Sequence, residues 1–319
     1  MKIGDKLYKE SLLYKISAGE NIEPLLKEGA NPNQMLLDGF NSTPIHIACD
    51  IPHFESIKTL IRYKADVNAV SKGGHTPLMR LMKKGDVGLA DFLLLSGAYI
   101  NAKDDMDRTA LWWASFYGQS EIIPLLVKKK ANPNIADLSE GLSPLMVASR
   151  YADLKTVRAL IKSGAEVNLV SGYGDTALTF SMLNKNKTQG VMIAEELIKA
   201  GADIHTRGIG KIKTKSLRPL VMAVKQQRLD MVKLLLKYRA RGMAEALFYA
   251  KQKGNQDILN LLYSSAQSKD ITFKNKEDMP LLLQSQSFSL LPVYKMEHCK
   301  NTIKKVLYTS KKECQKQKA

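Results

Sequence analysis

The chain has 319 residues and a formal net charge of +17, with 45% hydrophobic but only 7% aromatic residues. No apolar run approaches the roughly 20 residues that a membrane-spanning helix needs, and the N-terminal MKIGDKLYKE lacks the apolar core of a signal peptide. Three scattered cysteines form no CxxC or Cys/His cluster, which argues against a disulfide framework or a zinc site, so we expect a reduced, cytoplasmic protein.

The positive charge is concentrated in the C-terminal third. Residues 1–205 contain 24 Lys and Arg against 23 Asp and Glu, whereas residues 206–263 contain 13 against 3 and residues 264–319 contain 11 against 5. The first two thirds are therefore almost neutral. The basic character belongs to the C-terminal third.

Residues 1–33 are predicted to form an N-terminal capping repeat, followed by six repeats over residues 34–243. Each repeat opens with Thr or Ser, then Pro or Ala, then an apolar residue. The openings lie 33, 33, 34, 33 and 42 residues apart. A period of this length is typical of stacked helical repeats, in which each unit buries its apolar face against its neighbours. The six openings begin at Thr43, Thr76, Thr109, Ser143, Thr176 and, in degraded form, Arg218.

Each position within a repeat has a physical role. The opening hydroxyl accepts hydrogen bonds from free N–H groups of the first helical turn, and Pro at the first helical position loses no bond. A small pair such as Ala114-Ser115 lets two helices pack closely, and an apolar pair such as Leu125-Leu126 marks the second helix. Gly then ends that helix because it adopts the left-handed conformation without steric cost. Each repeat is therefore predicted to be a helix-turn-helix unit.

Two insertions interrupt this plan. Residues 184–190 are expected to lengthen the loop between the two helices of the fifth repeat. Residues 206–216 are expected to lengthen the following hairpin into a basic finger, a candidate contact with an anionic surface. Its candidate residues are Arg207, Lys211, Lys213 and Lys215.

The C-terminal segments differ from the repeats. Residues 244–266 are predicted to form a C-terminal capping helix pair, and residues 267–319 a basic tail that is partly helical or disordered. A basic amphipathic helix in the tail would suit an anionic membrane or a partner's groove. The favoured interpretation is that the tail folds back on the last repeat or remains disordered. The residues that would share its apolar face are Cys299, Ile303, Val306, Leu307 and Cys314.

The openings and closings, such as Thr43-Pro44-Ile45-His46 and Gly164-Ala165-Glu166-Val167-Asn168, resemble those of the ankyrin-repeat family over about residues 7–263. This resemblance implies an all-α solenoid of helix-turn-helix units joined by hairpin loops. Only the first opening keeps the whole tetrapeptide pattern. Elsewhere Ala replaces Pro at positions 110 and 177, and Lys replaces the capping Gly at positions 64 and 130.

The resemblance also implies that the hairpin tips and two positions late in the first helix line a concave binding face. Aromatic and cationic side chains occupy the middle of this face, and such residues often dominate binding energy. We expect Phe116 and Tyr117 to be exposed. Trp113 either adjoins the same face or fills a gap between repeats, as is expected of Trp112. The candidate partner-binding residues are Lys83, Lys84, Asp105, Met106, Arg108, Trp113, Phe116, Tyr117, Arg150, Tyr151 and Tyr173.

No GxSxG, P-loop, HExxH or HRD signature occurs in the sequence. His46 is interpreted as a structural residue that bonds backbone or the opening Thr, and Cys49 as a core residue rather than a nucleophile. Asp104, Asp105 and Asp107 would suit an acid/base pair or a cation site, but turns favour Asp through local backbone bonds. No catalytic residue, metal site or cofactor is therefore predicted.

These observations predict a non-enzymatic protein-protein interaction module, expected to be monomeric, that binds a protein partner through the groove and hairpin tips. The chain also looks similar to Lys- and Asn-rich ankyrin effectors that bacteria deliver into host cells, so a host protein in the host cytosol is one expected partner. The alternative is binding of an anionic membrane or nucleic acid through the basic C-terminal third. Lysines without interleaved exposed aromatics argue against base recognition.

Overall fold

The computed structural model describes residues 11–35, 39–205 and 217–267. These residues belong to two compact units, Met1–Arg241 and Gly242–Ala319. All regular structure in the described residues is α-helical, without a strand, which confirms the predicted fold class. Within the same residues, no helix combines the length and apolarity needed to cross a membrane.

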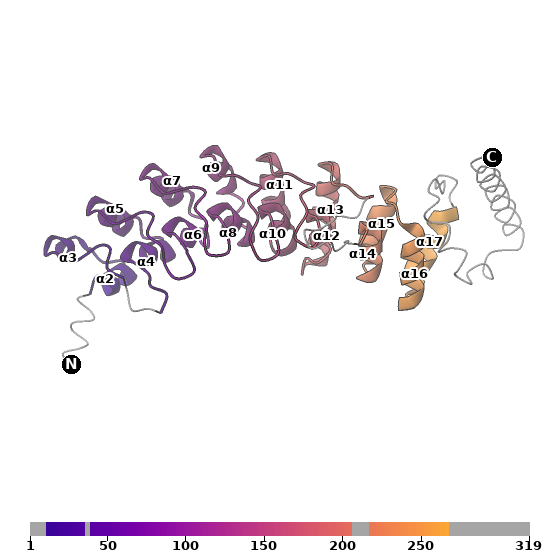
Figure 1. The fold of residues 1–319 in the computed structure, drawn as a ribbon, viewed down its shortest axis with the longest axis horizontal. Helices are drawn as coiled ribbons and strands as arrows, with labels where there is room; N and C mark the ends of the chain where they lie inside the picture. The colour runs from indigo at the N-terminus through magenta and orange to yellow at the C-terminus, as the bar shows by residue number, and fades with distance from the viewer. Residues whose placement is uncertain (1–10, 36–38, 206–216, 268–319) are drawn as a thin grey trace, which may run out of the picture. The chain divides into compact units, whose positions relative to one another are not determined.

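The helices of the first unit form two rows (Figure 1). The first row comprises α2 (Leu12–Ala18), α4 (Pro44–Asp50), α6 (Pro77–Leu81), α8 (Ala110–Phe116), α10 (Pro144–Tyr151), α12 (Ala177–Ser181) and α14 (Pro219–Lys225). The second comprises α3 (Glu23–Lys27), α5 (Phe54–Arg62), α7 (Val87–Leu95), α9 (Ile123–Lys128), α11 (Leu154–Lys162), α13 (Lys187–Lys199) and α15 (Leu229–Lys237). Each helix of the first row contacts the next one in that row, so the repeats stack in chain order.

The helices of the first row begin as the sequence predicts. The hydroxyl of Thr76 accepts a hydrogen bond from the backbone N–H of Met79 at 3.3 Å, and Thr109 accepts from Trp112 at 3.2 Å. Ser143 caps α10 in the same way. Because these bonds satisfy N–H groups that have no partner inside the helix, they fix where α6, α8 and α10 start.

Small residues allow the first-row helices to approach closely. Ala48, Ala114 and Ala148 occupy equivalent positions in α4, α8 and α10, and all three are fully buried. Ser115 and Ser149 are also fully buried, and each donates its hydroxyl hydrogen to the carbonyl four residues earlier at 2.7 Å. The contact between helices is therefore dense without leaving these buried hydroxyls unpaired.

Adjacent repeats are joined by a bond pair that we call the asparagine clasp. Asn101 shows its geometry: Nδ2 donates to the carbonyl of Lys130 at 3.1 Å, and Oδ1 accepts from the backbone N–H of Asn132 at 2.9 Å. One side chain thus satisfies a donor and an acceptor in the closing turn of the next repeat. The clasp residues are Asn33, Asn68, Asn101, Asn134 and Asn168, although Nδ2 of Asn134 donates to the Glu166 carboxylate instead of a carbonyl.

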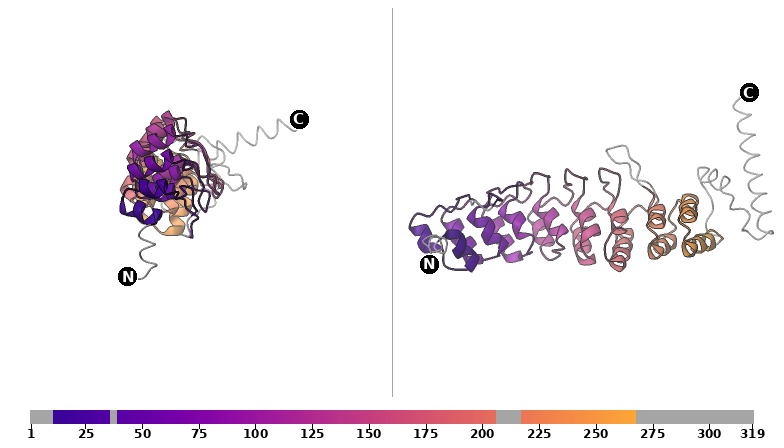
Figure 2. Two further views of the ribbon diagram at one scale, coloured as in Figure 1. Left: turned by 90° about the vertical axis from the view of Figure 1, so that its left-hand side faces the viewer. Right: turned by 90° about the horizontal axis from the view of Figure 1, so that it is seen from below.

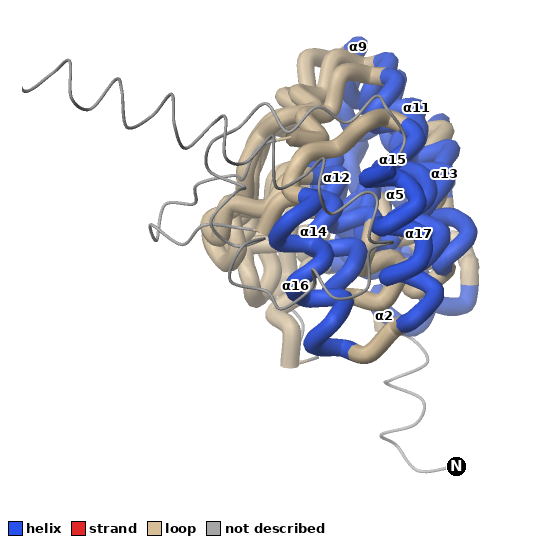
Figure 3. The backbone as a smooth tube through the Cα atoms, turned by 90° about the vertical axis from the view of Figure 1, so that its right-hand side faces the viewer, coloured by secondary structure: helices blue, strands red, loops and turns tan. Residues whose placement is uncertain are grey.

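The hairpin loops of the first unit lie along one edge of its helices (Figures 2 and 3). Backbone hydrogen bonds join each tip to the next one. The N–H of Asp105 donates to the carbonyl of Gly73 at 3.0 Å, and the N–H of Leu138 donates to the carbonyl of Met106 at 2.9 Å. Similar bonds join residues 72 and 40 and residues 172 and 140. The tips are therefore fixed relative to each other as well as to the helices.

The insertion in the fifth repeat differs from its prediction. A longer loop was expected over residues 184–190, but Lys187 already begins α13, which is 13 residues long. Asn186 caps this helix by accepting a hydrogen bond from the N–H of Gln189 at 3.1 Å. A Cβ atom on Gly190 would lie 2.5 Å from the carbonyl oxygen of Ser181, so glycine is required where α13 approaches α12. The insertion therefore extends a helix as much as a loop.

The asparagine clasp stops before the sixth repeat, where His205 takes the place of asparagine. A buried guanidinium of the sixth repeat contacts the fifth repeat at another place, between α12 and α13. Arg228 donates from Nη1 to the carbonyl of Met182 at 3.0 Å and from Nη2 to the carbonyl of Lys187 at 2.7 Å. Asp230 compensates its charge at 3.0 Å. These charge-assisted bonds lie between α12 and α13, at a different place from the closing turns that the asparagine clasps join.

In the second unit, α16 (Met243–Lys253) packs against α17 (Gln256–Gln267) around Ala246, Ala250, Ile258 and Leu262. This helix pair occupies the segment predicted as the C-terminal cap, and its capping role stays a prediction. The proposed basic finger with Arg207, Lys211, Lys213 and Lys215 lies outside the described residues, as does the tail from residue 268 onward.

A left-handed lysine allows a test of the turn chemistry. Lys130 has a φ of 70° at the position where other repeats have glycine. The left-handed conformation costs a residue with a side chain about 1–2 kcal/mol. Glycine avoids this cost, but it loses more backbone entropy on folding, which offsets part of the gain. We expect Lys130→Gly to raise the free energy of unfolding in urea by about 0.5–1 kcal/mol.

The matched control is Lys128→Gly, which places glycine at the last residue of α9. That substitution should lower the free energy of unfolding by about 0.5–1 kcal/mol, because glycine is a poor helix former. A loss of stability in both variants would contradict the assigned turn geometry.

Candidate functional site

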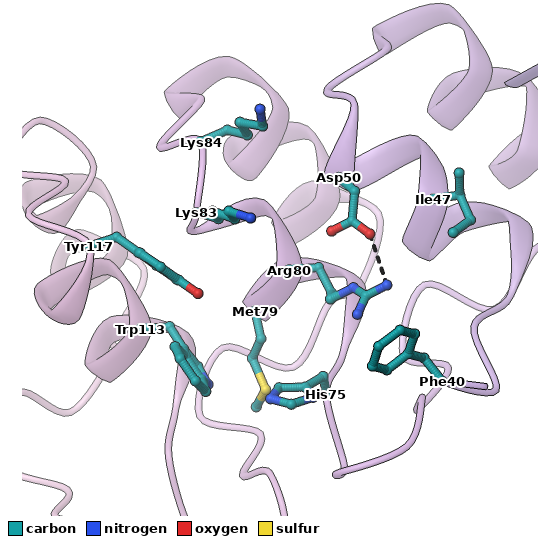
Figure 4. A pocket seen from close by; sticks show the side chains of 10 residues that line it. All are labelled: Phe40, Ile47, Asp50, His75, Met79, Arg80, Lys83, Lys84, Trp113 and Tyr117. Carbon is teal, nitrogen blue, oxygen red and sulfur yellow. Dashed lines mark ion pairs between the residues drawn. The ribbon is translucent and has the colours of Figure 1, made fainter. Parts of the chain in front are cut away.

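A hollow of about 570 Å³ lies at the first three repeats of the array (Figure 4). We call it the three-repeat hollow. The lining side chains come from helices α4, α6 and α8, the turns that follow α6 and α8, and two hairpin segments. They are Phe40, Ile47, Asp50, His75, Met79, Arg80, Lys83, Lys84, Trp113 and Tyr117. The fold thus gathers residues that are up to 77 positions apart in the sequence. Four of them are predicted partner-binding residues: Lys83, Lys84, Trp113 and Tyr117.

Trp113 is held rigidly at one side of the hollow. Its Nε1 donates to Oδ2 of Asp104 at 3.1 Å, and the guanidinium carbon of Arg108 lies 4.4 Å from its ring centre. The ring of Tyr117 stacks on it with a centroid distance of 5.8 Å, and the His75 ring lies at 5.4 Å. Both alternatives drawn from the sequence therefore describe Trp113, which is half-buried between neighbours and also lines the hollow.

Asp104 organises the hairpin beneath Trp113. Its side chain is buried, and Oδ1 accepts from the backbone N–H groups of Met106 and Arg108, each at 2.9 Å. Oδ2 accepts from Nε of Arg108 at 2.9 Å as well as from Trp113. These bonds support the turn interpretation of Asp104 over an acid/base role. Among the described residues, no group of three His, Cys, Asp or Glu side chains is placed to hold a metal ion.

Phe116 differs from its prediction, whereas Tyr117 does not. The Phe116 side chain is half-buried, and its ring lies parallel to that of Trp112 with centroids 5.6 Å apart. Trp112 is buried as expected and donates from Nε1 to the carbonyl of Leu142 at 3.1 Å. Tyr117 is 39% exposed. Phe116 therefore contributes to packing, and Tyr117 offers the accessible surface.

A second aromatic and cationic patch lies beside Phe116. The ring centre of Phe116 is 5.3 Å from the ring centre of Tyr151, and Tyr151 is 46% exposed. The guanidinium carbon of Arg150 lies 5.0 Å from the Tyr151 ring centre, and Nη1 of Arg150 is 3.6 Å from the carboxylate of Glu140. We call Arg150 and Tyr151 the α10 patch. It continues the aromatic row from the third repeat into the fourth.

The remaining predicted contacts lie on the hairpin segments. Asp105, Met106 and Tyr173 are all exposed, and none of them lines the three-repeat hollow. Phe40 and Leu138 are also exposed on these hairpins, and sequence analysis missed both. The structure therefore separates the predicted residues into the hollow, the α10 patch and the hairpin tips.

Sequence analysis also missed Ile47, Met79 and Arg80 in the hollow. Nη2 of Arg80, in the second repeat, forms an ion pair with Oδ2 of Asp50, in the first repeat, at 2.8 Å (Figure 4). No local pattern in the sequence indicates this pair, because Asp50 and Arg80 belong to different repeats. Burial raises the pKa of Asp50 from its ordinary value, although the Arg80 guanidinium acts in the opposite direction.

His46 and Cys49 belong to the core, as the sequence predicts. Nε2 of His46 donates to the carbonyl of His75 at 3.0 Å, and Nδ1 accepts from the backbone N–H of Thr43 at 3.1 Å. Burial lowers the pKa of His46 to about 4 and raises the pKa of the Cys49 thiol. Neither group is placed to react with a ligand, since both are fully buried.

Stacked helix pairs that are clasped to each other and joined by hairpin loops along one edge define a helical repeat protein. The family model for ankyrin repeats, in three copies, matches residues 12–104, 111–208 and 187–275. The chain belongs to the ankyrin-repeat family. Repeats of this family typically mediate protein-protein interaction and are generally non-enzymatic.

Similar curated proteins have different names and far greater lengths. The chain is 32% identical over 143 residues to glycerophosphocholine phosphodiesterase gde1 of Schizosaccharomyces pombe, a match to 44% of this chain and 13% of that protein. It is 29% identical over 167 residues to protein glp-1 of Caenorhabditis elegans, covering 48% and 13% respectively. Human inversin is 26% identical over 194 residues, covering 58% and 18%. The chain thus matches less than a fifth of the length of each relative.

The buried carboxylate of Asp104 can be tested directly. Asp104→Ala leaves the guanidinium of Arg108, the Nε1 of Trp113 and two backbone N–H groups without their acceptor. We expect a loss of about 2–4 kcal/mol in the free energy of unfolding. The emission of Trp113 should also shift to longer wavelength. Asp105→Ala removes the same charge from an exposed neighbour and should change stability little. Equal effects of the two substitutions would show that Asp104 is not the organising group.

The lowered pKa of His46 predicts a pH dependence of stability. Between pH 6.5 and about pH 4 the unfolded chain binds a proton at His46 that the folded protein does not bind. The contribution of neutral His46 is therefore fully present above pH 6.5 and lost as the pH falls toward 4. A His46→Gln variant should lose about 3 kcal/mol less stability across this window than the original protein. Parallel stability curves from urea unfolding would contradict the assignment.

Proposed function

We propose that this chain is a non-enzymatic protein-binding module, monomeric by itself, whose partner docks across the three-repeat hollow and the α10 patch. The carrying observation is that exposed aromatic and cationic side chains from four consecutive repeats meet on one face while their supports are buried. The interaction role typical of ankyrin repeats supports this function.

The energetics also favour binding at this face. Trp113 is fixed by a hydrogen bond, a stacked guanidinium and two rings, so a partner loses little entropy in ordering it. Tyr117 and Tyr151 stay accessible beside it. Large aromatic side chains with a polar end often dominate binding energy because they bury much area with few rotatable bonds.

A second candidate function is binding of an anionic membrane or nucleic acid through the C-terminal third. The observation in its favour is the 13 cations against 3 carboxylates in residues 206–263. Several described cations of this region are already paired, such as Arg228 with Asp230 at 3.0 Å and Lys237 with Glu195 at 3.3 Å. Binding to anionic vesicles and to nucleic acid across a salt series tests this candidate, because electrostatic binding weakens steeply with salt.

Substitution of the two exposed tyrosines tests the proposed function. In Tyr117→Ala/Tyr151→Ala, both hydroxyls and both exposed rings are removed, while Phe116 and Trp112 keep their parallel packing. Partners captured by the original protein should bind this variant with an affinity that is lower by at least about ten-fold, as expected for aromatic hot spots. Affinity capture with quantitative mass spectrometry identifies the partners, and titration of a purified partner gives the affinity.

The matched control is Tyr99→Ala. Tyr99 is 69% exposed in the turn after α7 and does not line the hollow, so its removal should leave partner capture unchanged. Thermal unfolding of all three proteins must show that the array remains folded. Undiminished capture by the folded double variant would remove this face as the binding site.

A further inference from the structure

We propose that the segment bound in the three-repeat hollow is acidic. It is a short, extended stretch of a protein partner that places carboxylates beside Lys83 and Lys84 and an apolar side chain against Trp113 and Met79. This inference rests on the proposed function and specifies the chemistry of the partner.

The charges of the hollow are the first argument. Its lining contains three permanent cations and one carboxylate. That carboxylate, Asp50, is paired with Arg80 at 2.8 Å, and Arg80 also donates to the hydroxyl of Ser42 at 3.1 Å. Lys83 and Lys84 are exposed and have no ion-pair partner within 4 Å among the described residues. Two positive charges therefore remain for a ligand to neutralise.

Helices of the second row show a different pattern. There, some cations are paired with carboxylates of neighbouring repeats, namely Lys129 with Asp91 at 2.7 Å and Arg158 with Glu196 at 2.9 Å, whereas others such as Lys155 have no ion-pair partner among the described residues. These ion pairs hold one repeat to the next one. Lys83 and Lys84 make no such contact, so their charges do not serve to join repeats.

The apolar part of the hollow is the second argument. Ile47, Met79, Phe40 and the ring of Trp113 line it together with the charged groups. Figure 4 shows the Tyr117 hydroxyl directed toward the space in front of Met79, with Lys83 on the adjacent turn. A ligand that fills this space must therefore carry an apolar group next to its negative charges.

These properties select a peptide over other anions. A volume of about 570 Å³ exceeds what a single carboxylate or phosphate group fills, and the apolar lining would remain wet around such an ion. A basic segment would be repelled by Lys83 and Lys84, whose charges are not paired with a carboxylate of the described residues. An acidic segment would place its carboxylates beside these two lysines and its apolar side chain against the apolar lining.

A display experiment with the full chain tests this proposal. A phage-displayed library of random linear peptides is selected against the original protein and, in parallel, against Lys83→Glu/Lys84→Glu. Peptides enriched on the original protein should combine several Asp or Glu residues with a Leu, Ile or Phe. Their affinity should fall about ten-fold or more in the double variant, as for the loss of contacts to charged groups.

The readout needs no label, because both tryptophans of the chain, Trp112 and Trp113, belong to this cluster. Synthetic copies of enriched peptides should change the tryptophan emission on titration. Replacing their Glu by Gln, or their apolar residue by Ser, should each weaken this response. The control variant is Lys155→Glu/Lys162→Glu, which makes the same change of charge on α11, away from the hollow, and should keep the affinity.

Three results would overturn the proposal: no peptide enriched on the original protein, enriched peptides without acidic residues, or equal loss of affinity in both double variants. The proposed function fails separately, if the folded Tyr117→Ala/Tyr151→Ala variant captures partners as well as the original protein does. If Tyr117→Ala/Tyr151→Ala abolishes partner capture while Lys83→Glu/Lys84→Glu binds as the original protein does, the face is a binding site. In that case the proposal that the bound segment is acidic is wrong.

Discussion

The side-chain amide of one asparagine per repeat determines how neighbouring repeats meet. Its two ends satisfy a carbonyl and an N–H of the next closing turn, groups that the turn itself leaves unpaired. A shift of one repeat along its neighbour would break both bonds together, so the clasp fixes the stacking register. Asn101 joins the second repeat, which carries Lys83 and Met79, to the third repeat, which carries Trp113. The hollow exists as one surface because this register is fixed.

The array changes its joining chemistry toward its C-terminal end. His205 replaces the clasp residue, and the contacts between the fifth and sixth repeats include the buried guanidinium of Arg228 and the pair of Lys237 with Glu195. Nη2 of Arg228 donates to the carbonyl of Lys187, the first residue of the long helix α13. An insertion that looks like an interruption of the repeat in the sequence thus supplies a hydrogen-bond acceptor for the sixth repeat.

The fold could be predicted from the sequence because each helix start depends on a few adjacent residues. Threonine caps and buried alanines follow local rules, so the helices lie where the openings place them. The site was only partly predictable, because its lining depends on contacts between repeats. Register alone identified Tyr117, whereas the burial of Phe116 results from Trp112 and from Tyr151 in the next repeat. Likewise, Arg80 became part of the site through its pairing with Asp50, a contact that no local pattern records.

Native-state hydrogen exchange of Asn101→Ala, compared with Asn132→Ala, tests the central claim that the clasp holds the binding surface together. Asn132 bonds only within its own turn through its side chain, so its replacement leaves both ends of the clasp in place. The account predicts that Asn101→Ala accelerates exchange at the backbone N–H of residue 132 and also across α6 and α8, two of the helices that line the hollow. Faster exchange at the backbone N–H of residue 132 alone, with α6 and α8 as protected as they are in Asn132→Ala, would contradict this account.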